Sequence, residues 1–226
     1  MNSASSDLTA PDRSHTVAIQ EPIQEEIDRA IHGLLASFPN PAQLSAGERR
    51  GIIARYTAVL EGNFIYWMTG AHLAVRTEQA RSIIVDNLLE EVRDCHPGMM
   101  RRFAIAADAV PTDSDAQAVY RNLMDVRLFV GRLSAVRLVA MMMFFEGFLQ
   151  RFMPYLAELA QRQGSNEMEY TDVHGVCDIA HTEGLRRALE AEIAAAREPR
   201  TAETNLFEGV DLLRALITNI VAAQAA

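Results

Sequence analysis

The sequence has 226 residues, of which 49% are hydrophobic, enough to build one substantial core, and its formal net charge is −9. The negative charge argues against a nucleic-acid-binding protein, which needs a basic face, and no apolar run is long enough to span a bilayer. With only 12 Gly and 8 Pro, and with Ala, Leu, Glu and Arg recurring in long runs, the composition favours an all-α fold.

The first residues lack the charged and apolar segments of a secretory signal, and two cysteines do not indicate a disulfide framework. We therefore expect a cytoplasmic protein. Cys95 and Cys177 each precede a residue of a polar motif, His96 and Asp178. We expect both thiols to be small buried hydrophobic side chains, with support of a neighbouring site as the alternative.

Residues 1–17 lack helical periodicity and are rich in Ser, Asp, Thr and Pro, which predicts a disordered tail before a single domain over residues 18–226. Apolar residues at helical spacing predict a first helix from about residue 21 to 37. Ser45 and Glu48 form a capping-box signature for a second helix that reaches about residue 75. A third helix is predicted from about residue 77 to 92.

His96 precedes Pro97, and because residues before proline avoid the α conformation, we predict a break between helices there. Pro97 is then well placed to open a fourth helix that ends near residue 109. The next helical region, from about residue 114 to 153, is too long for one ordinary helix, so we predict a break near Gly131.

The end of the chain is predicted to hold three more helices. A short helix follows Pro154 and ends at Gly164, and two longer helices cover about residues 171–197 and 202–223. The whole chain is therefore predicted to form an all-α bundle of seven to nine helices.

The most informative segment covers residues 170–183 and places His174, Asp178 and His181 at positions i, i+4 and i+7. At about 100° per residue, the three side chains lie within about 60° of one another on one helix face. Two imidazoles and a carboxylate that converge in this way suit a first-row transition metal, non-haem iron especially. Three solvated polar residues are the alternative, which the apolar flanking residues disfavour, since they would bury the segment.

Other polar residues stand in surroundings where they need partners. Glu61 lies in an apolar segment that also holds Trp67, and Glu146 is the only acid in a run of Met and Phe. Glu146 has an alternative use, which is an ion pair with Arg132 or Arg151. His96 and the third helix complete the set of candidates, the third helix with three carboxylates: Asp86, Glu90 and Glu91.

Six or seven carboxylates and imidazoles suit two iron or manganese ions better than one zinc ion, because a structural zinc site is four-coordinate and usually contains cysteine. Hydrolysis by two divalent cations is an open alternative for the same residue types. A ferritin-like bundle is disfavoured, because it needs a Glu-x-x-His motif on each of two helices and the sequence contains none.

The order of these motifs resembles the haem-oxygenase-like di-iron oxidase superfamily, whose members have a haem-oxygenase-like, TenA-like helical fold. The resemblance covers nearly all the chain after the tail. It consists of an early helical Glu, a segment Asn-Leu-x-x-Glu closely followed by His, a mid-chain Glu, and a late His-x3-Asp-x2-His. It implies six iron ligands: Glu61, His96, Glu146, His174, Asp178 and His181. The carboxylate from the third helix is Glu91, with Glu90 or Asp86 as alternatives, since Arg93 and Asp94 replace the usual glycine.

The resemblance also implies an activity, namely O2-dependent oxidation at two iron ions, with manganese as an alternative in one position and an external electron donor. Relatives of this type oxidise amines, amino acids and fatty acids, often in natural-product pathways, by N-oxygenation, desaturation or oxidative C–C cleavage that includes nitrile formation. We expect a small, amino-acid-derived substrate, no nucleic-acid or membrane partner, and a homodimer. Candidate substrate contacts are Trp67, Tyr170 and Arg137, with Tyr66, Tyr120, Arg127 and Arg132 as alternatives.

Two other classes of protein stay open. One is a cofactor-free, TenA-like hydrolase on the same fold, with Cys95 or Cys177 as the nucleophile. The other is a non-enzymatic helical partner protein, in which the same polar residues are only structural.

Overall fold

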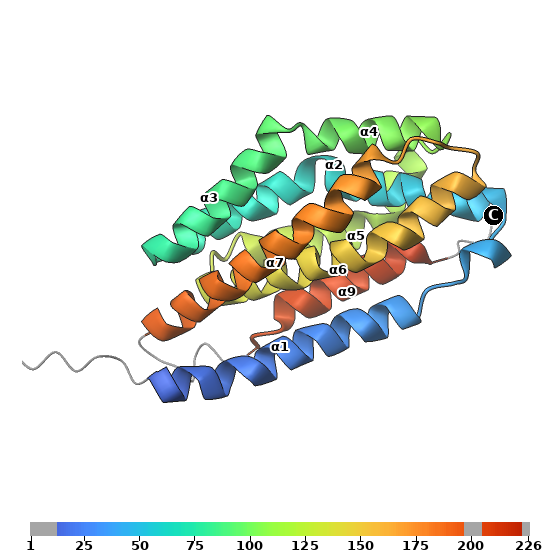
Figure 1. The fold of residues 1–226 in the computed structure, drawn as a ribbon. Helices are drawn as coiled ribbons and strands as arrows, with labels where there is room; N and C mark the ends of the chain where they lie inside the picture. Colours follow the sequence, from blue (N-terminus) through green and yellow to red (C-terminus); the bar gives the residue numbers. More distant parts are fainter. Residues whose placement is uncertain (1–12, 197–204, 223–226) are drawn as a thin grey trace, which may run out of the picture.

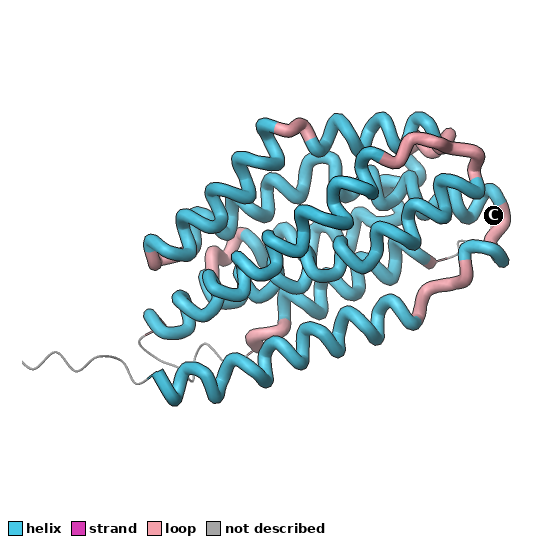
Figure 2. Tube along the Cα trace, in the orientation of Figure 1, coloured by secondary structure: helices cyan, strands magenta, loops and turns pink. Residues whose placement is uncertain are grey.

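The computed structural model describes residues 13–196 and 205–222, and side chains from residue 22 onward. The described residues form eight α-helices and no strand, which confirms the predicted all-α fold (Figures 1 and 2). The helices are α1 (Arg13–Ala36), α2 (Ala46–Ala74), α3 (Glu78–Arg93), α4 (His96–Ala106), α5 (Asp113–Val130), α6 (Ala135–Arg162), α7 (Glu169–Ala195) and α9 (Glu208–Val221), and a short 3-10 helix, η1 (Pro41–Gln43), lies between α1 and α2.

Polar caps begin several of these helices. Ser45 accepts a hydrogen bond from the backbone of Glu48, and Glu48 accepts one from the backbone of Ser45, so the predicted capping box is confirmed at the start of α2. Thr112 and Asp115 form a second capping box at the start of α5. Because such caps need only neighbouring residues, these two helix starts are fixed locally by the sequence.

The core is built around α6, which contacts α1, α2, α7 and α9. Its run of Met and Phe (Met141, Met142, Met143, Phe144, Phe145) is almost completely buried. Farther along the helix, Phe148 stacks on Phe144 and on Phe152, with ring centroids 6.3 and 5.0 Å apart. The apolar run therefore supplies core packing on most sides of the helix.

Helix α3 is joined to α7 at its first turn. Glu192 of α7 accepts hydrogen bonds from the backbone N–H groups of Arg76 and Thr77 at 2.9 and 2.8 Å, and from the Thr77 hydroxyl at 2.8 Å. These donors lie at the N-terminus of α3, where the first N–H groups lack partners within the helix. The contact places α3 alongside α7, which is where the candidate site forms.

Cys95 turns the chain between α3 and α4. Its φ of 56° is in the left-handed region, so α3 ends at Arg93 and α4 begins at His96. The predicted helix breaks at His96 and near Gly131 are both confirmed.

Two predicted helix boundaries are wrong. Helix α1 begins at Arg13, within the predicted tail, because the absence of an apolar repeat does not prevent a helix from extending before its packed turns. Pro154 lies inside α6 instead of ending it. Proline removes one backbone hydrogen bond, and the buried side chains of Leu156, Leu159 and Ala160 continue the packed face beyond it.

Some predictions concern residues that lie outside those described, namely 1–12 of the predicted tail and 197–204 before α9. Within the described residues, none of the helices is both long and apolar enough to cross a membrane.

Candidate metal centre

Helix α7 carries His174, Asp178 and His181 on its inner face, and all three side chains are buried. On the opposite face of the helix, Val176 and Ile179 are exposed. The spacing therefore produces the predicted convergence, but with the polar residues inside and two apolar residues in solvent. A buried polar stripe of this kind needs partners from neighbouring helices.

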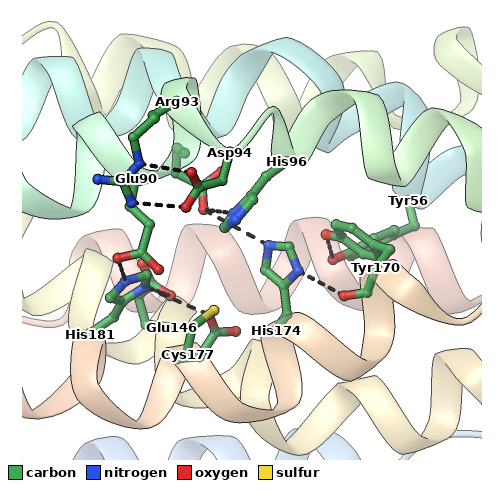
Figure 3. Close-up of polar contacts among 12 residues, drawn as sticks. Tyr56, Glu90, Arg93, Asp94, His96, Glu146, Tyr170, His174, Cys177 and His181 are labelled. Carbon is green, nitrogen blue, oxygen red and sulfur yellow. Dashed lines mark hydrogen bonds and ion pairs between the residues drawn. The ribbon is translucent and has the colours of Figure 1, made fainter.

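The first cluster consists of Glu91 from α3, His96 from α4 and His174 from α7, all buried, with ligand atoms within 4.8 Å of one another. His96 Nδ1 lies 2.7 Å from Glu91 Oε1, and His174 Nε2 lies 3.8 Å from the same oxygen. Figure 3 shows the imidazoles of His96 and His174 next to each other. His174 Nδ1 lies 2.8 Å from the carbonyl oxygen of Tyr170, to which it donates, so the lone pair of Nε2 faces the cluster.

The second cluster lies one turn along α7 and consists of Asp178, His181, Cys177 and Glu146 of α6. His181 Nδ1 lies 3.7 Å from Asp178 Oδ1 and 3.7 Å from Glu146 Oε2, too far for hydrogen bonds. The Cys177 thiol lies 3.3 Å from Asp178 Oδ1. The buried atoms Glu146 Oε1, Asp178 Oδ2 and His181 Nδ1 have no hydrogen-bond partner among the described residues.

Neither of the two arginines that the sequence offered neutralises Glu146. Arg132 pairs with Glu208 at 2.6 Å, and Arg151 pairs with Asp28 at 2.6 Å. A carboxylate that is 1% exposed and lacks such a cation is costly to bury. A divalent metal ion would remove that cost, since oxygen and imidazole ligands together suit iron or manganese. The donor set therefore fits a metal centre.

Burial governs the pKa values in the second cluster. Burial, and then the nearby charge of Glu146, raises the pKa of Asp178 from 3.8 to about 9. Burial also raises the pKa of Glu146. Burial alone would lower the pKa of His181, but the carboxylates of Glu146 and Glu90 raise it to about 9. The metal-free cluster therefore holds protons at neutral pH, and a metal ion has to displace them.

The first cluster behaves differently. Burial lowers the pKa of His174 from 6.5 to about 4, so its imidazole is neutral at pH 7 and ready to act as a ligand. Burial opposes the charged form of His96, but its hydrogen bond with Glu91 outweighs this and raises its pKa.

The stability of the metal-free protein should fall as the pH rises from 6.5 to 9. Asp178 and His181 have raised folded-state pKa values, so folding binds their protons, and that stabilisation is lost as the pH approaches about 9. Below pH 6.5 the lowered pKa of His174 acts in the opposite sense, because the unfolded chain binds its proton more tightly. Thermal unfolding with chelator present, measured from pH 5 to 9, checks this expectation; a midpoint that rises from pH 6.5 to 9 would contradict it.

Two carboxylates of α3 reach the clusters, one each. Glu91 belongs to the first cluster, and Glu90 Oε2 lies 3.3 Å from His181 Nε2 in the second. The Glu90 side chain is 35% exposed, whereas that of His181 is 6% exposed, so Glu90 covers the second cluster on its solvent side. Asp86 is exposed. The sequence treated Glu90 and Glu91 as alternatives, and the structure places both at the centre.

Replacing Glu90 with Gln should weaken iron binding by about 10- to 100-fold, the usual cost of losing a partner that orients a ligating histidine. The substitution would keep the size of the side chain but remove the charge that faces His181 Nε2. Anaerobic competition between the protein and a chromophoric Fe(II) chelator measures the change. Asp86→Asn, an exposed position on the same helix, serves as the control; equal affinities for the Glu90 variant and the wild type would contradict a role for Glu90.

Glu61 is not part of either cluster. Its side chain is 32% exposed and forms an ion pair with Arg101 of α4, so it has the cationic partner that the sequence required. Its assignment as an iron ligand stays a prediction.

The three predicted substrate contacts lie in different places. Tyr170 is at the first cluster, where the centroid of its ring lies 4.3 Å from the centroid of the His174 ring. Trp67 is completely buried against Phe145 of the core. Arg137 pairs with Glu208 of α9 at 3.5 Å. Only Tyr170 therefore adjoins the clusters.

Two features near the clusters differ from what the sequence predicted: a tyrosine that contacts Tyr170, and the exposure of the two cysteine thiols. Tyr56 of α2 lies with its hydroxyl 2.7 Å from that of Tyr170, and no motif marked it, because the pairing depends on the packing of α2 against the rest of the bundle. Cys95 is exposed, since the turn between α3 and α4 directs it outward, and Cys177 is only half-buried, beside Asp178. The expectation of two buried hydrophobic thiols is wrong.

Buried imidazoles and carboxylates from four helices of an all-α bundle are typical of a metal-binding protein. A family model described as iron-containing redox enzyme matches residues 53–213. The chain belongs to this haem-oxygenase-like family, which confirms the resemblance and the fold class predicted from the sequence. No curated protein and no solved structure matches the chain.

Proposed function

We propose that this protein is an O2-dependent, non-haem di-iron oxidase or oxygenase. The observation that carries the proposal is the pair of adjacent clusters, each with imidazole and carboxylate atoms turned inward, of which the second holds three buried atoms without hydrogen-bond partners among the described residues. Membership of a family of iron-containing redox enzymes supports iron as the metal. Manganese in one of the two positions is compatible with the same ligands.

In this proposal each cluster holds one iron ion. Glu91, His96 and His174 would bind the first ion, and Glu146, Asp178 and His181 the second, with Glu61 as a further ligand from α2. The iron would supply electron transfer to dioxygen, with reducing equivalents from an external donor. The protein itself buries the ligating side chains, fixes the imidazole of His174 through the Tyr170 carbonyl, and would release the protons of Asp178 and His181 when a metal ion binds.

We propose a small, amino-acid-derived substrate, oxidised by N-oxygenation, desaturation or oxidative C–C cleavage that includes nitrile formation, within natural-product biosynthesis. The resemblance of the ordered motifs supports this substrate class. The cytoplasmic location and the homodimer expected from the sequence stay predictions.

The hydrolase alternative is disfavoured by the state of the cysteines. Burial, and then the charge of Asp178, raises the pKa of the Cys177 thiol, so little of the nucleophilic thiolate forms at pH 7. Cys95 is exposed at the start of α4 and does not line the cavity beside the clusters. A purely structural role is disfavoured because, within the described chain, Glu146 and Asp178 each bury one carboxylate oxygen that has no hydrogen-bond partner.

Anaerobic loading with Fe(II), followed by rapid mixing with O2, tests the proposal. We expect the bound iron to be oxidised and O2 to be consumed. A chemical reductant should sustain the consumption of O2, and in a substrate screen the amino-acid-derived substrate should change its rate. Iron that binds but does not react with O2 would contradict the O2-dependent function, and activity without any metal would favour the hydrolase.

A further inference from the structure

A small cavity adjoins the first cluster and not the second. It has a volume of about 20 Å³ and lies between α2, α3, α4, α6 and α7. One wall is apolar and the other is formed by the first cluster and its neighbour; the apolar wall comprises Leu60, Phe64, Ile65, Pro97, Met100 and Leu149, and the polar wall Glu91, His96, Tyr170 and His174.

Several polar atoms of the polar wall are already paired with one another. His96 Nδ1 contacts Glu91, His174 Nδ1 contacts the Tyr170 carbonyl, and the Tyr170 hydroxyl contacts Tyr56. A metal ion in the first cluster would take one further ligand atom from each of Glu91, His96 and His174. Once they are taken, the remaining surface is apolar and offers a water molecule too few of the two to four partners that it needs.

The volume sets the size of the occupant. A cavity needs roughly 10–15 Å³ of such volume to hold one water-sized molecule. At about 20 Å³, this cavity is large enough for one molecule of two or three atoms but too small for an amino acid without rearrangement. The combination of small size, an apolar wall and a metal-ligating wall restricts the occupant to a small uncharged molecule.

We propose that this cavity is the dioxygen site of the protein, from which O2 reaches the metal held by Glu91, His96 and His174. The inference rests on the proposed function and adds that O2 reaches one of the two clusters and not the other. Dioxygen meets the first cluster from the apolar side of the cavity, whereas the second cluster, which lines no part of the cavity, is covered by the partly exposed Glu90.

A second cavity provides an internal control. It has a volume of about 10 Å³ and is lined by ten residues that include Val59, Trp67 and Leu216, but by no residue of either cluster. It is at the lower limit for one water-sized molecule. A larger side chain in this second cavity should therefore disturb packing about as much as one in the cavity beside the first cluster, without changing the access of O2.

Xenon, an apolar atom that binds in dry cavities, tests the site without any metal. We expect xenon pressure on the metal-free, methyl-labelled protein to shift the NMR signals of Met100 and Leu149, and to leave those of Val59 and Leu216 unchanged. Leu149→Phe should abolish the shift at Met100, and Leu216→Phe should preserve it. No xenon shift at Met100 and Leu149 in the wild type would overturn the inference.

The Fe(II)-loaded protein gives the second readout. Leu149→Phe should bind as much iron as the wild type and react with O2 about tenfold more slowly, which corresponds to about 1.4 kcal/mol in the barrier, while Leu216→Phe reacts at the wild-type rate. Met100→Phe replaces the first variant if Leu149→Phe does not fold. An unchanged O2 rate in a filled, iron-loaded variant would overturn the inference. Failure of the wild type to bind iron would instead overturn the proposed function, and the xenon experiment would still decide whether the cavity holds an apolar gas.

Discussion

Replacing His174 with Ala should reduce the iron content of the loaded protein from about two ions per chain to about one, because affinity in the first cluster should fall by more than the roughly 100-fold upper range for partners that only orient a ligand. His174 Nε2 is the nitrogen that faces Glu91, and its neutral imidazole needs no proton loss to bind metal. The second cluster should keep its ion because Glu146, Asp178 and His181 are unchanged. Iron counted after anaerobic loading and gel filtration measures the effect.

His32→Ala is the matched control for this variant, since His32 is exposed on α1 and belongs to neither cluster. Its iron content should equal that of the wild type. A His174 variant that retains the wild-type content, with normal helicity by circular dichroism, would show that the first cluster does not bind iron.

Replacing Asp178 with Asn should have two opposite effects. Metal binding at the second cluster should be lost, while the metal-free protein should become more stable, because the buried Asp178 carboxyl group has a raised pKa and the unfolded chain ionises it more readily. Asp178 is 1% exposed, has one oxygen without a hydrogen-bond partner among the described residues, and lies beside the equally buried Glu146. The fold therefore tolerates this group at a cost, because at neutral pH it has to keep a proton that the unfolded chain would release.

Thermal unfolding of the metal-free Asp178 variant and wild type measures that cost. The gain in midpoint should increase from pH 5 to pH 9, because burial makes the wild-type carboxyl group harder to ionise and the cost of ionising it rises with pH. Asp172→Asn, an exposed position on the same helix, should change the midpoint little at any pH. A destabilised Asp178 variant at pH 8 would mean that this carboxylate stabilises the fold rather than serving a metal.

The parts of the centre that depend on one helix were predictable from the sequence. The spacing of His174, Asp178 and His181 fixes a common face on α7, and the proline after His96 marks the break that places this residue at the start of α4. Glu146 could be identified because a lone acid in an apolar run needs a partner, wherever that partner comes from.

The parts that depend on several helices were not predictable. Glu61 has apolar neighbours in sequence, but Arg101 of α4 lies close enough to pair with it, and only the packing of α2 against α4 decides this. Likewise, the choice between Glu90 and Glu91 has no answer from periodicity, because neighbouring positions on α3 reach two clusters that lie one turn apart on α7.

Metal analysis of the wild-type protein after anaerobic Fe(II) loading tests the central claim most directly. We predict about two iron ions per chain, the number that two adjacent clusters of hard and imidazole ligands would hold. Binding should release protons, since Asp178 and His181 hold them in the metal-free state. A protein that retains no iron, with no proton release on addition of Fe(II), would contradict the account.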